Sequence, residues 1–516
     1  MRRVRFAPVL GITLTAVLSF ALVLSAAQSG HLPIGGKVSA AQAAAQKDAV
    51  QWTGTWAASP QRPHGTGFGD VTLRLIIHTT IGGSATRIRL SNAFGTRPVQ
   101  IGSASVGIEA DGAAVEPGTL RPLTFGNGQD GATMQPGGQL TSDGVPEDVP
   151  ADANLAVSLY LPVYTGPATE HADNSSHQVS YISAPGDHTG DPTSAWFPSR
   201  MQTWYFLSGV DVDNPGTSAV VTLGDSITDG THSTTDTNHR YPNWLADRLE
   251  AAGGPYSRLA VLNAGIGGNE LLRTSACCHA SPSALDRFNT DVLDQPGVKD
   301  IVVMLGTNDI LGAHQATAPE VIAGLKELIT RAHARGVRIF GATIIPSAHY
   351  TLAGNETRLA VNRWITTSGA FDGVFDFAAA VADPADPAEM RPSYSSRDHL
   401  HPDDTGYHAI ADAVNLADLL GQAGSTEVAD AASDSSARSC LVQASLRVVT
   451  PESGIDATCQ ATPAARPAAA GTTGIGGKAV PARRKPAVGQ DKPVAAIGGK
   501  AAQPIGGKAA VSVPAQ

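Results

Sequence analysis

Charged and aromatic side chains are scarce in this sequence. Charged residues make up 16% of its 516 positions and aromatic residues 5%. So few aromatic side chains leave no obvious stripe for binding lipid. The formal net charge of −10 argues against a core that binds nucleic acid, because such a core would present a basic face. The hydrophobic content of 42% is enough for a packed core and excludes disorder throughout the chain.

Long apolar runs are also missing, with one exception near the start of the sequence. Residues 7–24 form an apolar run that follows arginines at positions 2, 3 and 5 and precedes small residues at 25–27. This order is typical of a secretory signal peptide. We therefore expect residues 1–27 to be a signal peptide and the protein to be extracellular. The alternative is an uncleaved membrane anchor, because the run nearly reaches the length of a bilayer span.

Cysteine is rare as well, with four residues: Cys277, Cys278, Cys440 and Cys459. C-x-x-C spacing is absent, which argues against a zinc site. An exported protein meets an oxidising compartment, where disulfides form. Cys440 with Cys459 is the simplest pairing, whereas the two adjacent cysteines could bond each other only with strain or stay free. The sequence does not decide between these pairings.

Residues 421–516 form a low-complexity tail rich in Ala, Pro and Gly. From residue 460 onwards it has eight basic residues and one acidic residue. The tetrapeptide Ile-Gly-Gly-Lys occurs three times in the tail and once near the start, at 34–37. We interpret these repeats as linker. The sharper alternative is a weak association of the basic tail with an anionic envelope polymer.

The remaining sequence divides into two regions with different patterns. After a linker at 28–49, residues 50–210 show short alternating runs, the clearest at 71–77, 86–90 and 155–161, with Gly82 and Gly83 as a turn signal between the first two. This pattern predicts an antiparallel β-sandwich or jelly-roll-like domain.

Residues 216–420 instead alternate between β and α patterns. Buried strands are predicted at 219–223, 259–262, 301–305, 337–340 and 374–377. Helical patterns lie between them, clearest at 319–335 and 356–368. The region is therefore predicted to be an α/β domain with a parallel sheet and helices on both faces. In such sheets the functional site lies beyond the carboxyl ends of the strands.

A serine stands directly after the first of these strands. Gly224 and Asp225 precede Ser226, which places the serine at the carboxyl edge of the sheet, at the start of a turn. A serine is a poor nucleophile without a base. Taken alone, Gly-Asp-Ser is commoner as a turn than as a catalytic site.

Asp398 and His401 lie three residues apart, just before a last predicted helix that begins near residue 405. In a turn, this spacing can bring the carboxylate onto Nδ1 of the imidazole and leave Nε2 facing a serine. His399 is the competing base. We assign the base to His401 because it has the spacing to Asp398, and we expect His399 to be a neighbouring loop residue. Taken alone, the segment is as well explained as a polar loop that caps a helix.

Two further segments follow the next two strands. The glycine-rich turn at 263–269 can expose backbone N–H groups to an oxyanion. A phosphate-binding loop is the alternative, but the full dinucleotide spacing is missing. Asn308, in the segment 306–309, could point an amide into the same pocket, although such an Asn is more often a helix cap.

Together these segments resemble the SGNH/GDSL hydrolase family. The four family blocks correspond, in order, to residues 224–226, Gly268, 306–309 and 398–401. The resemblance covers about residues 216–420. It implies a flavodoxin-like, three-layer α/β fold and a serine esterase or acylhydrolase that needs no metal and no cofactor.

The resemblance also implies a role for each candidate residue. Ser226 is the nucleophile, His401 the general base, and Asp398 the residue that orients His401. The oxyanion is held by the backbone N–H groups of Ser226 and Gly268 and by the side-chain amide of Asn308.

The first half of the chain resembles the two-domain actinobacterial members of this family. The segments that carry this looser resemblance lie at 51–58, 89–95 and 204–207. It implies an arylesterase or acylhydrolase attached to a xylan-degrading system. Short acyl esters, such as acetyl esters of carbohydrates or aryl esters, are therefore the expected substrates. The alternatives are a lipase or phospholipase and, from another class, a non-catalytic carbohydrate-binding protein.

Overall fold

The computed structural model describes residues 50–65, 67–171, 177–275 and 281–421. The expected signal peptide and linker, all four cysteines and the tail beyond residue 421 lie outside the described residues. The predictions for them therefore stay predictions. Within the described part of the chain, each helix is too short or too polar to cross a membrane.

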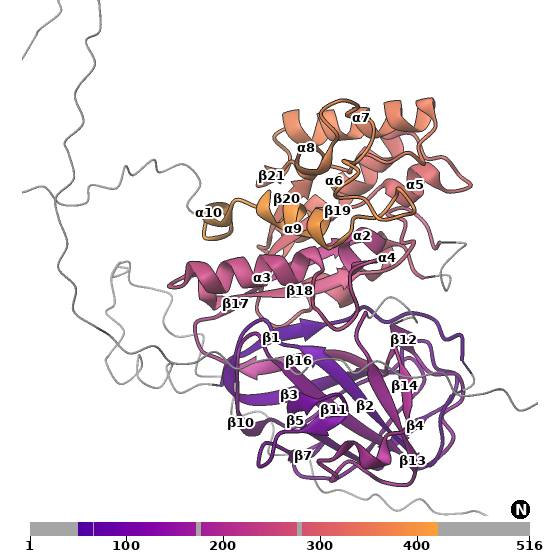
Figure 1. Ribbon diagram of the computed structural model, residues 1–516, viewed down its shortest axis with the longest axis vertical. Helices are drawn as coiled ribbons and strands as arrows, with labels where there is room; N and C mark the ends of the chain where they lie inside the picture. The colour runs from indigo at the N-terminus through magenta and orange to yellow at the C-terminus, as the bar shows by residue number, and fades with distance from the viewer. Residues whose placement is uncertain (1–49, 66, 172–176, 276–280, 422–516) are drawn as a thin grey trace, which may run out of the picture. The chain divides into compact units, whose positions relative to one another are not determined.

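The first region, residues 50–213, is built from strands and is called here the N-terminal sheet region (Figure 1). Its elements are β1 (Trp52–Ala57), β2 (Val71–His78), β3 (Gly83–Ser91), β4 (Val99–Ile101), β5 (Ser103–Asp111), β6 (Ala114–Val115), β7 (Arg121–Leu123), β8 (Ala132–Met134), β9 (Gln139–Thr141), β10 (Val145–Val149), β11 (Asn154–Leu161), β12 (Glu170–His171), β13 (Ser180–Pro185), η1 (Ser194–Trp196), β14 (Ser199–Met201), β15 (Trp204–Tyr205) and β16 (Leu207–Asp213).

Two antiparallel sheets form most of this region. One has the order β1-β16-β3-β10, with β9 also paired to β3. The other has the order β14-β13-β2-β11-β5-β6, with β7 also paired to β5. Alternate side chains of the predicted runs fill one shared core, to which Leu73, Leu75 and Ile77 of β2 and Ile88 and Leu90 of β3 belong.

The turn signal at Gly82 and Gly83 does not close a hairpin. β2 pairs with β11 and β13, whereas β3 pairs with β16, β10 and β9, so the two strands lie in different sheets. A Cβ at position 82 would lie 2.4 Å from the carbonyl oxygen of Val149. The glycine pair therefore permits a tight crossing from one sheet to the other.

The second region, residues 216–421, is called here the parallel-sheet region. Its strands are β17 (Ser218–Gly224), β18 (Leu259–Gly265), β19 (Val298–Met304), β20 (Arg338–Ala342) and β21 (Gly373–Phe375). They lie in the order β18-β17-β19-β20-β21, and all four pairs are parallel. The predicted α/β class of this region is confirmed.

Helices follow each strand of this sheet. They are α2 (Ser226–Asp229), α3 (Tyr241–Ala252), η2 (Tyr256–Arg258), α4 (Ala284–Phe288), η4 (Asn289–Leu293), α5 (Thr307–Leu311), α6 (Ala318–Ala334), α7 (Leu352–Thr367), α8 (Phe377–Val381), α9 (Asp404–Asp412) and α10 (Leu416–Leu419). The predicted helix at 319–335 starts one residue earlier, after Thr317, whose N–H donates to Glu320 Oε2.

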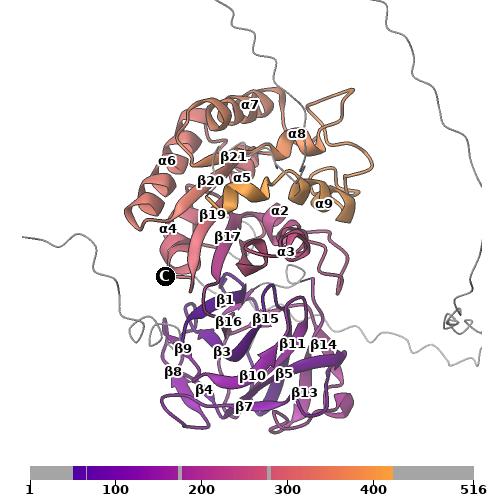
Figure 2. The same cartoon turned by 90° about the vertical axis from the view of Figure 1, so that its left-hand side faces the viewer.

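Both faces of the parallel sheet are covered. Ala219, Val221 and Leu223 of β17 share a buried cluster with apolar residues of α6. Val220, on the opposite face, belongs to a second cluster with apolar residues of α3 and α9. Figure 2 shows α4 and α6 on one side of the strands and α3 and α9 on the other. The continuous apolar run of β17 is explained by this burial on two sides.

The two regions belong to one compact unit and share a core. The backbone N–H of Gly54 in β1 donates to the carbonyl of Pro296, at 3.0 Å. A Cβ at position 54 would lie 2.8 Å from a methyl carbon of Leu262 in β18, so β1 approaches β18 closely. Thr80 adds a side-chain contact, because its Oγ1 accepts from the N–H of Val261 at 3.2 Å.

Gly265, at the end of β18, allows helix α2 to pack directly on the strand. A Cβ at this position would lie 2.2 Å from the backbone nitrogen of Asp229. We expect Gly265→Ala to lower the free energy of unfolding by about 1–3 kcal/mol, the usual cost of overpacking. Urea unfolding followed by fluorescence measures this change.

Gly190→Ala is the matched control, because a Cβ there would meet nothing within 4 Å. Its effect should stay within about 0.5 kcal/mol. Equal stability of the two variants would contradict the close approach of α2 and β18.

Candidate active site

The turn after β17 presents Ser226 at the carboxyl end of the sheet. Asp225 caps α2, and its Oδ1 accepts the N–H of Ile227 at 3.0 Å. Burial raises the pKa of Asp225 to about 7. The negative charge of nearby Asp309 also raises this pKa, whereas the hydrogen bond from the Ile227 N–H lowers it. Gly230 ends the helix in the left-handed region, at φ 103°. The four-residue helix thus leaves Ser226 half-buried at its first position.

Asp398, His401 and Ser226 form one chain of hydrogen bonds. His401 Nδ1 lies 2.6 Å from Asp398 Oδ2, and His401 Nε2 lies 2.8 Å from Ser226 Oγ. An ionised carboxylate can only accept, so Nδ1 carries the ring proton and Nε2 is free to accept the serine proton. The structure therefore brings together the three residues that the sequence singled out, across 175 positions of chain.

The local turn fixes the Asp398 carboxylate. Its Oδ1 accepts from the N–H groups of Leu400 and His401, at 2.9 and 3.0 Å, and from Ser396 Oγ at 2.7 Å. Burial by itself would raise the pKa of Asp398, but these hydrogen bonds and that of the His401 side chain hold it well below its usual range. Asp398 is thus ionised at neutral pH.

The His401 imidazole is held in its neutral form. Burial lowers its pKa below the ordinary value, although the hydrogen bond and negative charge of Asp398 raise it. Positive charge on His232 or His349 lowers it further. A neutral imidazole is the form that can take a proton from a serine hydroxyl.

Gly268 and Asn308 lie at the ends of β18 and β19, the two strands that flank β17. Gly268 adopts φ 68°, in the loop after β18, and the N–H of Asn269 donates to Ile266 O at 3.1 Å. Asn308 Nδ2 donates to Asn269 O at 3.0 Å, which uses one of its two N–H groups and orients the amide. Backbone and amide donors beside a reactive serine are suited to stabilise an oxyanion.

His399 lies in the same turn as Asp398 and His401 and has an exposed side chain. Its φ of 57° belongs to the left-handed region. Its carbonyl accepts from Ser347 Oγ at 2.8 Å. Its N–H also donates to Ser396 O at 3.2 Å, so His399 contacts its surroundings through its backbone.

Sequence reasoning missed two histidines beside the carboxylate. His232 Nε2 lies 3.0 Å from Asp398 Oδ2, and its ring centre is 5.4 Å from that of His401. His349 Nε2 lies 2.7 Å from the carbonyl oxygen of Asp398. His232 follows the serine by six residues, but no spacing rule marks it among the 15 histidines of the chain.

His232, Asp398 and His401 offer potential metal-ligand atoms within 4.8 Å of one another. A divalent metal bound by His401 Nδ1 would displace the proton that this nitrogen donates to Asp398. Metal binding through Nδ1 and the hydrogen-bonded chain to Ser226 therefore exclude each other.

Comparison with solved structures finds likenesses to parts of this chain. A protein from Desulfitobacterium hafniense DCB-2 assigned to the G-D-S-L lipolytic family is 20% identical, with 38% of this chain and 97% of that chain covered and a TM-score of 0.30. A carbohydrate acetylesterase family member from Sinorhizobium meliloti is 18% identical, with 40% and 97% covered and a TM-score of 0.31. A GDSL-like lipase from Bacteroides thetaiotaomicron is 17% identical, with 40% and 89% covered and a TM-score of 0.29.

A search of curated protein sequences finds no match. The sequence model of the GDSL-like lipase/acylhydrolase family matches residues 222–409. This span contains the strand end, the turn and the loops that position Ser226, Asp398 and His401. Residues 222–409 thus carry a GDSL-like lipase/acylhydrolase domain, and the protein is an ester-hydrolysing enzyme.

Proposed function

We propose that the protein is a serine esterase that cleaves short-acyl carboxylic esters through an acyl-enzyme on Ser226. The observation that carries this proposal is the unbroken chain of hydrogen bonds from Asp398 through His401 to Ser226 Oγ. Acetyl esters of carbohydrates and aryl esters are the proposed substrates.

Proton transfer in this reaction runs through His401. As Ser226 Oγ attacks the ester carbonyl, Nε2 of His401 takes the hydroxyl proton, and it then gives the proton to the leaving alcohol. Water attacks the acyl-enzyme with the same imidazole as base, which frees the acid and restores the serine. Asp398 keeps Nδ1 protonated and stabilises the imidazolium that forms twice in each cycle.

Negative charge on the carbonyl oxygen is stabilised by fixed donors. We assign this role to the backbone N–H groups of Ser226 and Gly268 and to the amide of Asn308. Their positions at the ends of three adjacent strands support the assignment. Donors that are already oriented need no reorganisation when the charge appears, so they lower the barrier to acyl transfer.

The polar surroundings of Ser226 favour a small acyl group. His232 and His349 contact Asp398 beside the serine, and Asn308 lies at the neighbouring strand end. The second candidate function is a lipid acylhydrolase, which would need an apolar surface for a long chain. A non-catalytic carbohydrate-binding protein, the alternative from another class, does not agree with the family match, which indicates an ester-hydrolysing enzyme.

Finer features of the architecture and location are also proposed. The strand order of the parallel sheet supports a flavodoxin-like, three-layer domain at 216–420, and the two antiparallel sheets support a sandwich or jelly-roll-like domain at 50–210. The basic and apolar start of the sequence supports export after a signal peptide at 1–27. The basic residues of the tail support a weak association with anionic envelope polymers.

Ser226→Ala tests the nucleophile directly. It should abolish labelling by a fluorophosphonate probe and hydrolysis of p-nitrophenyl acetate, because it removes the hydroxyl that lies against His401 Nε2. His401→Ala should lose nearly all labelling, whereas His399→Ala should keep it, since its side chain is exposed in the same turn. Retained labelling of Ser226→Ala would refute the proposal, and the reverse order of the two histidines would exchange their roles.

An ester panel tests the substrate class. The purified enzyme should hydrolyse p-nitrophenyl acetate and acetylated xylan faster than p-nitrophenyl esters of long acyl chains or phospholipid. Rates that rise with chain length would favour the lipid acylhydrolase instead. Ser226→Ala gives the background for each ester.

His232→Asn tests the electrostatics of the base. His232 disfavours a second positive charge on His401, so its removal should raise the pKa of His401. Because the neutral imidazole is the active form, the acid limb of the kcat/KM profile should move to higher pH. His408→Asn is the control, since this exposed histidine contacts Asp412. A shift to lower pH, or equal profiles, would contradict the prediction.

A further inference from the structure

Ser59, just after β1 in the N-terminal sheet region, contacts two cationic side chains at once. Its carbonyl oxygen lies 3.0 Å from His171 Nδ1, and its Oγ accepts from Arg287 NH1 at 2.9 Å. Ser59, His171, Asp229 and Arg287, all buried, are called here the Ser59 clasp. Two of its members belong to the N-terminal sheet region and two to the parallel-sheet region.

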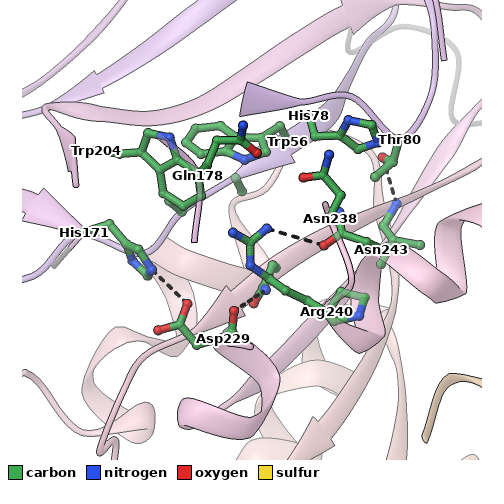
Figure 3. Close-up of a pocket in the computed structure, with 15 residues that line it drawn as sticks. Trp56, His78, Thr80, His171, Gln178, Trp204, Asp229, Asn238, Arg240 and Asn243 are labelled. Carbon is green, nitrogen blue, oxygen red and sulfur yellow. Dashed lines mark hydrogen bonds and ion pairs between the residues drawn. The ribbon is translucent and has the colours of Figure 1, made fainter. Parts of the chain in front are cut away.

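The first arm of the clasp runs through His171 and Asp229. His171 Nε2 lies 2.9 Å from Asp229 Oδ1, and the two side chains face each other in Figure 3. The other carboxylate oxygen, Oδ2, accepts from the backbone N–H of Gly267 at 3.1 Å. This arm therefore extends from the N-terminal sheet region to the residue before Gly268.

Both ring nitrogens of His171 face oxygen atoms, the Ser59 carbonyl at Nδ1 and Asp229 Oδ1 at Nε2. The carbonyl can only accept, so Nδ1 carries a proton, and a carboxylate partner at Nε2 favours the imidazolium. Burial and the charge of Arg240 lower its pKa, but Asp229 and the Ser59 carbonyl outweigh them and raise the pKa above its ordinary value. A buried charge of this kind is tolerated only with well-placed partners, so both contacts are directional constraints.

The second arm runs through Arg287. Its Nε and NH2 groups donate to Asn269 Oδ1, at 3.1 and 2.9 Å, and NH2 also donates to the carbonyl of Gly224 at 3.1 Å. Asp291 accepts from NH1 at 3.2 Å, beside Ser59 Oγ. Arg287 thus ties the residue after Gly268 to the end of β17, two residues before Ser226.

The two arms meet the loop on either side of the proposed oxyanion donor. Asp229 holds Gly267, and Arg287 holds Asn269. Gly268, between them, has a left-handed φ of 68° that glycine adopts without steric cost, so its own sequence does little to fix its orientation. Hydrogen bonds to both neighbours supply the restraint instead.

We propose that the N-terminal sheet region positions the oxyanion loop of the catalytic site through the Ser59 clasp. Ser59 and His171 are positioning residues in this proposal, because they act on the Gly268 N–H through Asp229 and Arg287. The proposal rests on the esterase function proposed above and gives the N-terminal sheet region a part in the chemical step.

The experiment compares His171→Ala and His171→Gln with a matched control in the full chain. His188→Ala is that control: this buried histidine also lies near a carboxylate oxygen, Asp191 Oδ2 at 2.8 Å, and a carbonyl, Pro185 O at 3.3 Å. Both of these partners lie within the N-terminal sheet region. Each variant is assayed with p-nitrophenyl acetate well below its melting temperature, after circular dichroism shows that it is folded.

We expect His171→Ala to lower kcat by about 10- to 100-fold with little change in KM, because a donor misplaced by about 1 Å loses transition-state stabilisation. Asn308→Ala removes a proposed donor itself, so its expected loss of kcat, roughly 10²–10³-fold, is the largest that misplacing one donor could cause. His171→Gln, which can still donate to Asp229, should recover part of the loss. His188→Ala should keep the kcat of the unaltered protein.

Two outcomes separate failure of this proposal from failure of the proposed function. If Ser226→Ala is inactive but folded His171→Ala and His171→Gln keep full kcat, the clasp has no role in positioning. The same conclusion follows if kcat falls equally in the His171 and His188 variants. If Ser226→Ala keeps its activity, the esterase mechanism itself fails.

Discussion

The hydrogen bond between Asp398 Oδ2 and His401 Nδ1, 2.6 Å long, is the constraint on which the rest of the site depends. It decides which ring nitrogen carries the proton and therefore which nitrogen faces Ser226. The carboxylate that imposes this choice is itself fixed by two backbone N–H groups and a serine hydroxyl of its own turn. The serine after β17 and the donor segments after β18 and β19 can act together only because this tautomer leaves Nε2 free to accept the serine proton.

Much of the fold and of the candidate site could be predicted because these features depend on short-range rules. The three-residue spacing of Asp398 and His401 is a local property of one turn, and the position of Ser226 follows from the strand before it. The parallel sheet was predictable from apolar runs that alternate with helical patterns, since strands buried on both faces show this composition. The neighbourhood of Gly268 and Asn308 follows from the shared carboxyl edge of adjacent strands.

The remaining features depend on pairs of residues that are distant in sequence. His232 meets Asp398 across 166 positions, His171 meets Asp229 across 58, and Arg287 meets Ser59 across 228. No periodicity or spacing encodes such pairs, because they arise where loops and sheets that are distant in sequence pack together. Gly82 and Gly83 show the same limit: their local signal indicates a turn, but the partners of β2 and β3 are set by how the two antiparallel sheets pack.

The approach of β1 and Thr80 to β18 has a consequence for how the molecule avoids association. β18 is the outermost strand of the parallel sheet, and such strands offer unpaired backbone groups to other chains. The N–H of Val261 donates to the hydroxyl of Thr80, and the backbone of Gly54 lies close to the side chain of Leu262. The N-terminal sheet region thus covers part of this edge strand and hinders another chain from pairing with it there.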